Sequence, residues 1–149
     1  MEIQKLPVYP VLTCGLNESA KEIAKKLKEK KERRIFVVGS DGKLKGLITT
    51  TDLVYKALGE DNKSIKAEDI MTKNVMAVDI CENFEKALEI MNKLESFVCP
   101  IVDKEKIVGI VSYHDMVGHI FQSIENFGKD SQISPKFSKG QFLKTEGQN

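Results

Sequence analysis

The sequence lacks an excess of charge of either sign. Its 149 residues carry 23 basic and 22 acidic side chains, for a formal net charge of +1. Without a strong overall field, the chain has no bulk electrostatic attraction for nucleic acid or for an anionic membrane. We therefore expect no membrane partner, and a nucleic-acid partner is not favoured.

The sequence also lacks the cysteine and histidine spacings of disulfide frameworks and metal sites. Cys14, Cys81 and Cys99 are an odd number, and none has C-x-x-C spacing. We expect all three to be small buried hydrophobic residues in a reducing compartment. His114 and His119 lie five positions apart, unlike the i,i+4 pairs of helical zinc sites, so we predict no metal.

Long apolar stretches and catalytic motifs are missing too. No segment approaches the roughly 18 apolar residues of a membrane-spanning helix, and the N-terminus lacks the pattern of a secretory signal. There is no G-x-S-x-G motif, no Walker phosphate loop and no cysteine with an evident histidine partner. These absences predict a cytoplasmic protein that is not an enzyme, while an apolar fraction of 41% is sufficient for a folded core.

What the chain does contain is an internal repeat. An apolar stripe with i, i+3, i+4, i+7 spacing occurs twice, 64 positions apart (84 − 20), at Ala20, Ile23, Ala24 and Leu27 and at Phe84, Ala87, Leu88 and Met91. Each stripe predicts an amphipathic helix with one buried face. Ser19 and Glu22 have capping-box spacing before the first helix, and Asn83 is a candidate cap for the second.

The same elements follow both predicted helices. In chain order they are a β-prone run at 35–38 or 99–102, a turn at 40–43 or 103–106, a strand at 44–49 or 107–112, and a helix at 50–58 or 113–121. We also expect a short strand before each unit, at 11–13 and 75–78. The repeat therefore predicts an α/β (α+β) fold built from two β-α-β-β-α units.

Composition sets the predicted boundaries of these units. The first repeat is placed at 6–58 and the second at 69–125. A charged and polar linker is placed at 59–68, and the polar segment 126–149 is assigned to a tail that adds little to the core.

Each unit ends on the same signature, which resembles that of a known family. The two copies read Gly46-Leu47-Ile48-Thr49-x-x-Asp52-Leu53 and Gly109-Ile110-Val111-Ser112-x-x-Asp115-Met116. Together with Asp69-Ile70-Met71-Thr72 and the run 99–103, they are similar to tandem cystathionine-β-synthase-type (CBS) domains, the Bateman module. The resemblance implies that two repeats pack through their sheets with pseudo-twofold symmetry and leave two clefts. Pro7 and Phe36 depart from the family pattern.

The signature also has a physical use. A hydroxyl followed three residues later by a carboxylate, at a strand-to-helix junction, places a donor and an acceptor beside the amides of a helix N-terminus. The carboxylate could accept both hydrogen bonds of a ribose diol, and the hydroxyl and amides could contact a phosphate. A simple helix cap remains the alternative role for Asp52 and Asp115.

The resemblance implies the residues of both clefts. The first would comprise Thr49, Asp52, Leu47, Met71 or Thr72, Met76, Phe97 and the neighbouring Ser96. The second would comprise Ser112, Asp115, Ile110, Leu12 and Arg33. Apolar members would enclose the adenine and the aspartates would hold the ribose, while phosphates would contact Thr49, Ser112, Arg33, Arg34 and His114. Arg33 and Arg34 could equally be the solvated end of a basic helix.

The function implied by the resemblance is a non-catalytic regulatory module. Its ligand would be AMP, ADP, ATP or S-adenosylmethionine, with no required cofactor, and it would form a homodimer that acts on an unidentified regulated protein. One alternative is a ligand-free structural or protein-interaction module. A second is a nucleic-acid-associated protein that uses the basic strip 25–34, although interleaved glutamates and the lack of stacking aromatics weigh against it. The sequence does not distinguish the adenosine ligands or the use of one cleft from two.

Overall fold

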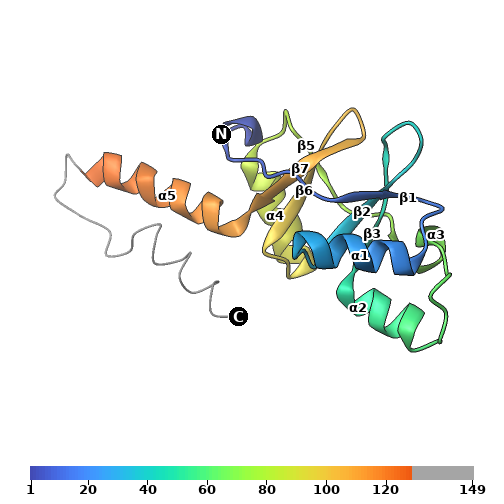
Figure 1. The fold of residues 1–149 in the computed structure, drawn as a ribbon. Coiled ribbons are helices and arrows are strands. Elements are labelled where there is room, and N and C mark those ends of the chain that lie inside the picture. The colour runs from blue at the N-terminus through green and yellow to red at the C-terminus, as the bar shows by residue number, and fades with distance from the viewer. Residues whose placement is uncertain (129–149) are drawn as a thin grey trace.

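The structure is a computed structural model that describes residues 1–128, with side chains through residue 126. Two sheets form the framework (Figure 1). The first has strand order β1-β2-β3-β4 and the second has order β5-β6-β7. Their bounds are β1 Thr13–Gly15, β2 Arg34–Val38, β3 Leu44–Thr49, β4 Thr72–Lys73, β5 Val78–Asp79, β6 Val98–Asp103 and β7 Lys106–Ser112.

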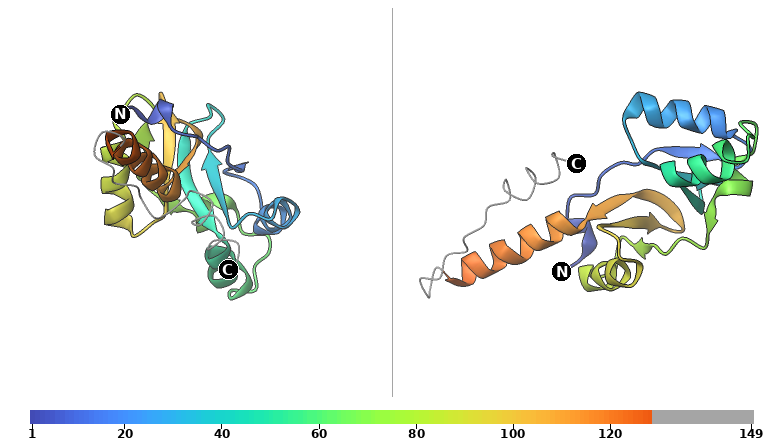
Figure 2. Two further views of the ribbon diagram at one scale, coloured as in Figure 1. Left: turned by 90° about the vertical axis from the view of Figure 1, so that its left-hand side faces the viewer. Right: turned by 90° about the horizontal axis from the view of Figure 1, so that it is seen from below.

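Helices connect and cover the strands. They are the 3-10 helix η1 (Ile3–Lys5), α1 (Ala20–Lys30), α2 (Thr50–Asp52), the π-helix η2 (Leu53–Leu58), α3 (Ala67–Ile70), α4 (Phe84–Leu94) and α5 (Tyr113–Gly128). The predicted β-α-β-β-α order is confirmed in both copies. The sheets lie between α1 and α4 (Figure 2), and α5 projects from the body of the molecule (Figure 1). No helix within residues 1–128 is long and apolar enough to cross a membrane.

Helix α1 shows why the sequence pattern produces this local structure. The Ser19 hydroxyl accepts a hydrogen bond from the Glu22 amide, and the Glu22 side chain accepts one from the Ser19 amide, which confirms the predicted capping box. The stripe residues Ile23 and Leu27 are buried. Asn83 also occupies a cap position, before α4, but its side chain makes no cap hydrogen bond there.

Both leading strands begin later than predicted. The ladder of β1 starts where the Phe36 amide donates to the Leu12 carbonyl, and Thr13 is the first residue in register with β2. In the second copy Val78 is the first paired residue, opposite Ile101. The predicted strands at 11–13 and 75–78 were therefore placed too early. The segment before each of these strands crosses instead to the sheet of the other repeat.

Each repeat donates a short extended segment to the sheet of the other. Tyr9 pairs antiparallel with Ile110 of β7, and Thr72 pairs antiparallel with Leu47 of β3. The two pairings are equivalent, since both partners are shifted by 63 positions (72 − 9 and 110 − 47). This exchange gives the fold its pseudo-twofold relation.

The exchange extends into the two hydrophobic cores. Ile3 and Leu6 pack in the core of the second repeat, whereas Ala67 and Ile70 pack in the core of the first. The stretch assigned to a polar linker thus ends in a helix with a fully buried alanine. The stretch assigned to the tail begins inside α5, which continues to Gly128, and residues 129–149 lie outside the described part.

The cysteines differ from one another in burial. Cys14 and Cys99 are buried, as predicted, and burial raises the pKa of each thiol to about 12. The prediction was wrong for Cys81, which is exposed. Cys81 lies in the turn after β5, where its amide donates to the Asp79 carboxylate at 2.9 Å, so the turn geometry directs it toward solvent.

Candidate functional site

The first junction, between β3 and α2, is organised by Thr49 and Asp52. The Asp52 Oδ2 atom accepts hydrogen bonds from the Thr49 amide at 2.9 Å and from the Thr49 hydroxyl at 3.1 Å. In return, Thr49 Oγ1 accepts a hydrogen bond from the Asp52 amide at 3.3 Å. The pair therefore forms a capping box, which fixes the carboxylate at the helix N-terminus.

A lysine holds the other oxygen of this carboxylate. Lys56 Nζ lies 3.1 Å from Asp52 Oδ1 and donates to the Ile70 carbonyl at 3.0 Å. The Asp52 side chain is 16% exposed, so this ion pair is more protected from water than a pair on the open surface. Each carboxylate oxygen has two lone pairs, which leaves Asp52 acceptor capacity for a further donor.

The second junction, between β7 and α5, repeats the arrangement. Ser112 Oγ donates to Asp115 Oδ2 at 2.8 Å and accepts from the Asp115 amide at 3.1 Å. Asp115 is 7% exposed and is the buried charged residue in the described part of the chain. The Tyr9 phenol donates a hydrogen bond to the Asp115 carboxylate, and this bond raises the pKa of Tyr9 above its ordinary value.

The neighbouring carboxylate partners distinguish the two junctions. Asp52 pairs with the cation of Lys56, whereas Asp115 accepts from the neutral phenol of Tyr9. The residue equivalent to Lys56 is His119 (56 + 63), and the residue equivalent to Tyr9 is Thr72 (9 + 63). The described partners of the two carboxylates therefore come from different positions of the repeat.

The exchanged segments bring predicted apolar residues next to each junction. Leu47 is in register with Thr72, and a Cβ on Gly46 would lie 2.5 Å from the sulfur of Met71. Ile110 is in register with Tyr9 at the second junction. The structure thus brings Leu47, Met71 and Thr72 to the strand that carries Thr49.

Other predicted residues lie beside the junction of their own repeat. The Phe97 ring is 69% exposed and meets the Tyr113 ring edge-on, with centroids 6.1 Å apart. Its carbonyl accepts from the Tyr113 amide, just as the Arg33 carbonyl accepts from the Thr50 amide. Arg34 is in register with Thr49. The assignment of Arg33 and Phe97 to the opposite clefts stays a prediction.

The remaining predicted residues take supporting positions. Leu12 packs against the first core and Met76 against the second. The Ser96 hydroxyl donates to the Val98 carbonyl at 2.9 Å. His114 is half-buried in the first turn of α5. Their contact with a ligand stays a prediction as well.

Sequence reasoning missed Tyr9 and Lys56. Lys56 had a usable signal, because it follows Asp52 at i,i+4, where a cation on the same helix face can pair with the acid. Tyr9 had a weaker one, namely its offset of 63 from Thr72 in the repeat. The first signal does not show that Lys56 contacts the Ile70 carbonyl. The second does not show that Tyr9 contacts the Asp115 carboxylate.

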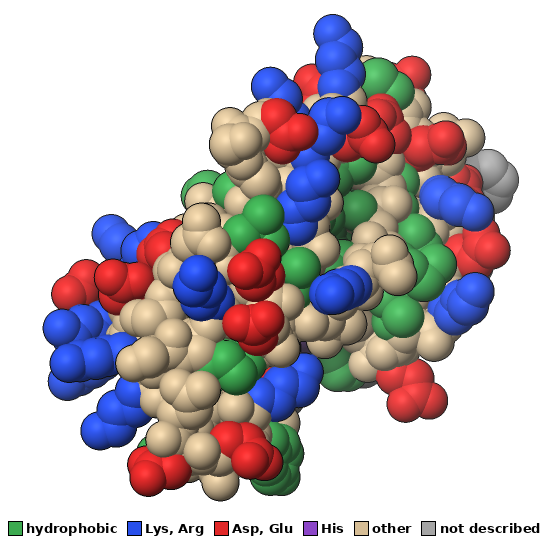
Figure 3. All heavy atoms as spheres, turned by 90° about the vertical axis from the view of Figure 1, so that its right-hand side faces the viewer, with side chains coloured by type: hydrophobic (Ala, Val, Ile, Leu, Met, Phe, Trp, Pro, Cys, Tyr) green, Lys and Arg blue, Asp and Glu red, His purple; other side chains and the backbone are tan. Residues whose placement is uncertain are grey.

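The described residues hold no cluster that could bind a metal, and the one face seen in Figure 3 carries both signs of charge. Residues 1–128 contain no group of three or more His, Cys, Asp or Glu side chains that could hold a metal ion. Basic and acidic side chains are mixed over the face shown in Figure 3. Within the basic strip, Lys26 forms an ion pair with Glu18 at 2.5 Å.

The family model that matches the chain is the CBS domain, with one match over residues 3–59 and another over residues 67–122. The chain belongs to the CBS domain family. The tandem matches and the exchanged edge segments confirm the predicted pair of CBS repeats.

One curated relative contains the matched CBS pair as a small part of a longer chain. A homoserine O-acetyltransferase of Methanohalobium evestigatum is 37% identical over 116 residues, which is 76% of this chain and 23% of that enzyme. The chain thus spans about a quarter of the length of that relative. Its named activity belongs to the larger protein.

Two solved structures share the fold. The CBS domain pair of protein MJ0100, in complex with 5′-methylthioadenosine and S-adenosyl-L-methionine, is 30% identical with a TM-score of 0.65, covering 83% of this chain and 97% of that one. The cytosolic domain of the Mg²⁺ channel MgtE, in complex with ATP, is 24% identical with a TM-score of 0.69. It matches over 78% of this chain and 47% of that one.

Proposed function

We propose that this CBS pair is a non-catalytic, cytoplasmic regulatory module that binds an adenosine-containing ligand at one or both strand–helix junctions. The ligand class comprises AMP, ADP, ATP and S-adenosylmethionine. The observation that carries the proposal is the duplicated hydroxyl–carboxylate pair, Thr49 with Asp52 and Ser112 with Asp115, held at 2.8–3.1 Å between side chains. The complexes of MJ0100 and MgtE support the choice of ligand class.

The geometry suggests how the ribose and phosphates would be held. Each aspartate is oriented by its helix cap before a ligand arrives, so little side-chain entropy is lost on binding. A ribose hydroxyl can donate to the remaining lone pairs of the carboxylate. A phosphate at the helix N-terminus would compete with Asp52 or Asp115 for the hydroxyl proton of Thr49 or Ser112, so phosphate binding has a cost that ribose binding lacks.

Calorimetric titration with each of the four ligands tests the ligand class and the number of sites. A stoichiometry of one or two adenosine ligands per chain is the expected result. An adenosine-binding module is ruled out if none of them binds at millimolar concentration, and the ligand-free interaction module then becomes the better account.

Regulation requires that the ligand favour one of two states of the module. A change in the packing of the two repeats, or ordering of a segment, would transmit binding to a regulated protein. Small-angle scattering and hydrogen exchange, compared with and without ligand, would detect such a change. Identical profiles with and without ligand would show that the module binds the ligand but is not regulated by a change of conformation.

We further propose that the module forms a homodimer through its helices. Val54, Tyr55 and Leu58 on η2 are 52%, 71% and 65% exposed, which leaves an apolar surface for a second chain. Sedimentation at micromolar concentration should therefore show a species of twice 16.7 kDa.

A further inference from the structure

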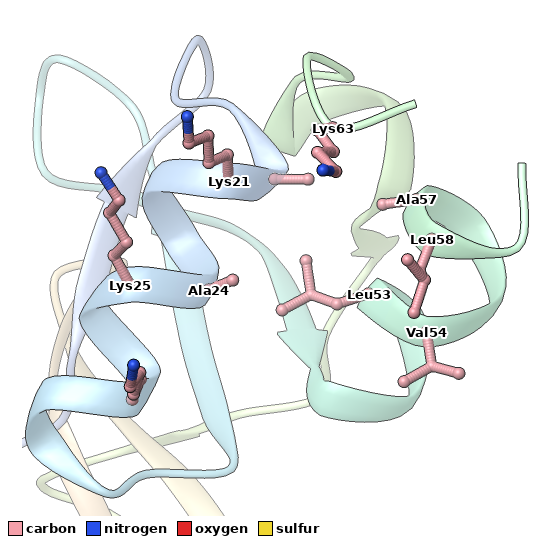
Figure 4. Close-up of a pocket in the computed structure, with 10 residues that line it drawn as sticks. Lys21, Ala24, Lys25, Leu53, Val54, Ala57, Leu58 and Lys63 are labelled. Carbon is pink, nitrogen blue, oxygen red and sulfur yellow. The ribbon is translucent and has the colours of Figure 1, made fainter. Parts of the chain in front are cut away.

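An apolar groove runs between α1 and η2, outside the proposed ligand sites. Its volume is about 420 Å³, and its lining includes Ala20, Ala24, Ala57 and Leu58. Lys21 and Lys25 extend from the α1 side, while Leu53 and Leu58 lie on the side of η2 (Figure 4). The groove therefore combines an apolar floor with a basic edge.

The second repeat has an equivalent surface between α4 and α5, and there the side chains are larger. Ala20 corresponds to Phe84 and Ala24 to Leu88 (offset 64), while Ala57 corresponds to Ile120 (offset 63). Phe84 and Ile120 line the hollow between α4 and α5. At three equivalent positions, one repeat thus presents a methyl group and the other presents a bulky apolar side chain.

The charges on the surface of α1 are opposite in sign to those at the equivalent positions of α4. Lys21 and Lys25 of α1 correspond to Glu85 and Glu89 of α4. Where both helices carry a charge at equivalent positions, the sign is opposite in every case: Lys21 and Glu85, Glu22 and Lys86, Lys25 and Glu89, Glu29 and Lys93, and the C-caps Lys31 and Glu95. All ten of these side chains (five pairs) are exposed, so internal packing does not require the reversal.

We infer that a second copy of this chain occupies the α1–η2 groove and that the two copies associate head to tail. The α4–α5 face of one protomer packs on the α1–η2 face of its partner, and a twofold axis repeats the contact. This inference rests on the proposed homodimer and adds its orientation.

Size and charge both favour this orientation over the head-to-head arrangement. Head-to-tail contact places Phe84, Leu88 and Ile120 over the alanine-lined floor of the partner's groove. It also places Glu85 and Glu89 within reach of the partner's Lys21 and Lys25. Head-to-head contact would oppose lysine to lysine and alanine to alanine, so it would lose both the packing and the electrostatic complementarity.

Charge reversal tests the orientation on the full chain without ligand. We expect Lys21→Glu combined with Lys25→Glu, and Glu85→Lys combined with Glu89→Lys, each to raise the dimer dissociation constant at least tenfold in sedimentation equilibrium. Mixing the two variants should restore association, because one chain is then acidic and the other basic on both faces. Lys5→Glu with Lys104→Glu, an equal charge change at exposed sites elsewhere, should leave the dissociation constant unchanged.

Cross-linking provides a second test that does not depend on charge. In a Cys81→Ser background, a mixture of Ala24→Cys chains and Leu88→Cys chains should form an intermolecular disulfide on mild oxidation, and neither variant alone should. Cross-linking of Ala24→Cys alone, or a tighter dimer with Lys21→Glu and Lys25→Glu, would overturn the orientation while leaving the homodimer intact. A wild-type chain that stays monomeric at every concentration would overturn both. Neither test depends on whether the protein binds a ligand.

Discussion

Tyr9 and Ile110 exchange two backbone hydrogen bonds, at 2.8 and 2.9 Å, across a separation of 101 residues (110 − 9). Through this pairing the N-terminal segment closes the edge of the second sheet and carries Ile3 and Leu6 into the second core. The same segment delivers the Tyr9 phenol to Asp115. Folding of the second repeat and assembly of its proposed ligand site therefore depend on the first nine residues.

Leu6→Ala should destabilise the protein by about 2–5 kcal/mol, the usual cost of truncating a buried leucine. Leu6 is 6% exposed and lies in the second core, although in sequence it belongs to the N-terminal end of the first repeat. Urea unfolding measures the change. Leu94→Ala, at a leucine that is 48% exposed, is the matched control and should cost no more than about 0.5 kcal/mol. Equal costs would show that the N-terminal segment does not pack in the core.

Gly109→Ala should be more destabilising than Gly46→Ala. A Cβ on Gly109 would lie 2.3 Å from the Tyr9 carbonyl oxygen, which is held in the sheet, whereas a Cβ on Gly46 would meet the flexible Met71 side chain at 2.5 Å. We expect a cost of about 1–3 kcal/mol at Gly109 and less at Gly46 in thermal unfolding. The reverse order would contradict the close approach of Tyr9 to β7.

The local elements could be predicted from the sequence because each has a local cause. Burial of Ile23 and Leu27 on α1, the Ser19 capping box and the strand at 35–38 follow from periodicity, hydrogen bonding and apolar composition, and the structure confirms them. Ala24 of the predicted stripe is exposed instead. The signature at Thr49 and Asp52 was predicted in the same way, and the two side chains do meet. Repetition allowed the second copy to be placed from the first.

The exchanged segments could not be predicted, because their pairing is non-local and short. Tyr9 has a single ladder partner, and Thr72 and Lys73 form a two-residue strand, so neither leaves a periodic pattern. The contact of Lys56 with the Ile70 carbonyl depends on the same exchange, since α3 packs on the first repeat. Burial of Ala67 was missed for this reason too.

Alkaline pH should destabilise the fold through Cys14 and Cys99. Burial raises the pKa of both thiols to about 12, above an ordinary value of 9.0, so the folded state holds these protons more tightly than the unfolded state. Their stabilisation is complete below pH 9 and is lost as the pH rises toward 12. Unfolding free energy should fall by up to about 1.4 kcal/mol per pH unit for each thiol in this window.

Urea unfolding at several pH values measures this slope. Cys14→Ala with Cys99→Ala should flatten it, and Cys81→Ser, at the exposed thiol, should keep most of it. In the native protein at neutral pH a thiol reagent should label Cys81 quickly and the other two after unfolding. Rapid labelling of all three would contradict their burial.

Tyr9→Phe should cost at most about 1 kcal/mol at neutral pH by removing the hydrogen bond to Asp115, because Tyr9 is 45% exposed and water weakens the bond. This bond raises the pKa of Tyr9 above 10.0, so its stabilisation is present below pH 10 and is lost as the pH rises through the folded pKa. The difference in unfolding free energy between wild type and variant should therefore shrink above pH 10. Tyr55→Phe is the control, because Tyr55 is 71% exposed. A difference that does not change with pH would argue against the Tyr9–Asp115 bond.

Thermal unfolding with a ligand panel tests most directly whether the duplicated junctions bind adenosine ligands. The panel comprises AMP, ADP, ATP, S-adenosylmethionine, NAD and GTP, applied to wild type, Asp52→Ala and Asp115→Ala, each compared with its own midpoint without ligand. A ligand at about 100 times its dissociation constant adds roughly 2.7 kcal/mol, which is seen as a higher midpoint. We predict stabilisation by an adenosine ligand that one or both substitutions abolish. The absence of a shift with every ligand, or a shift that survives both substitutions, would contradict it.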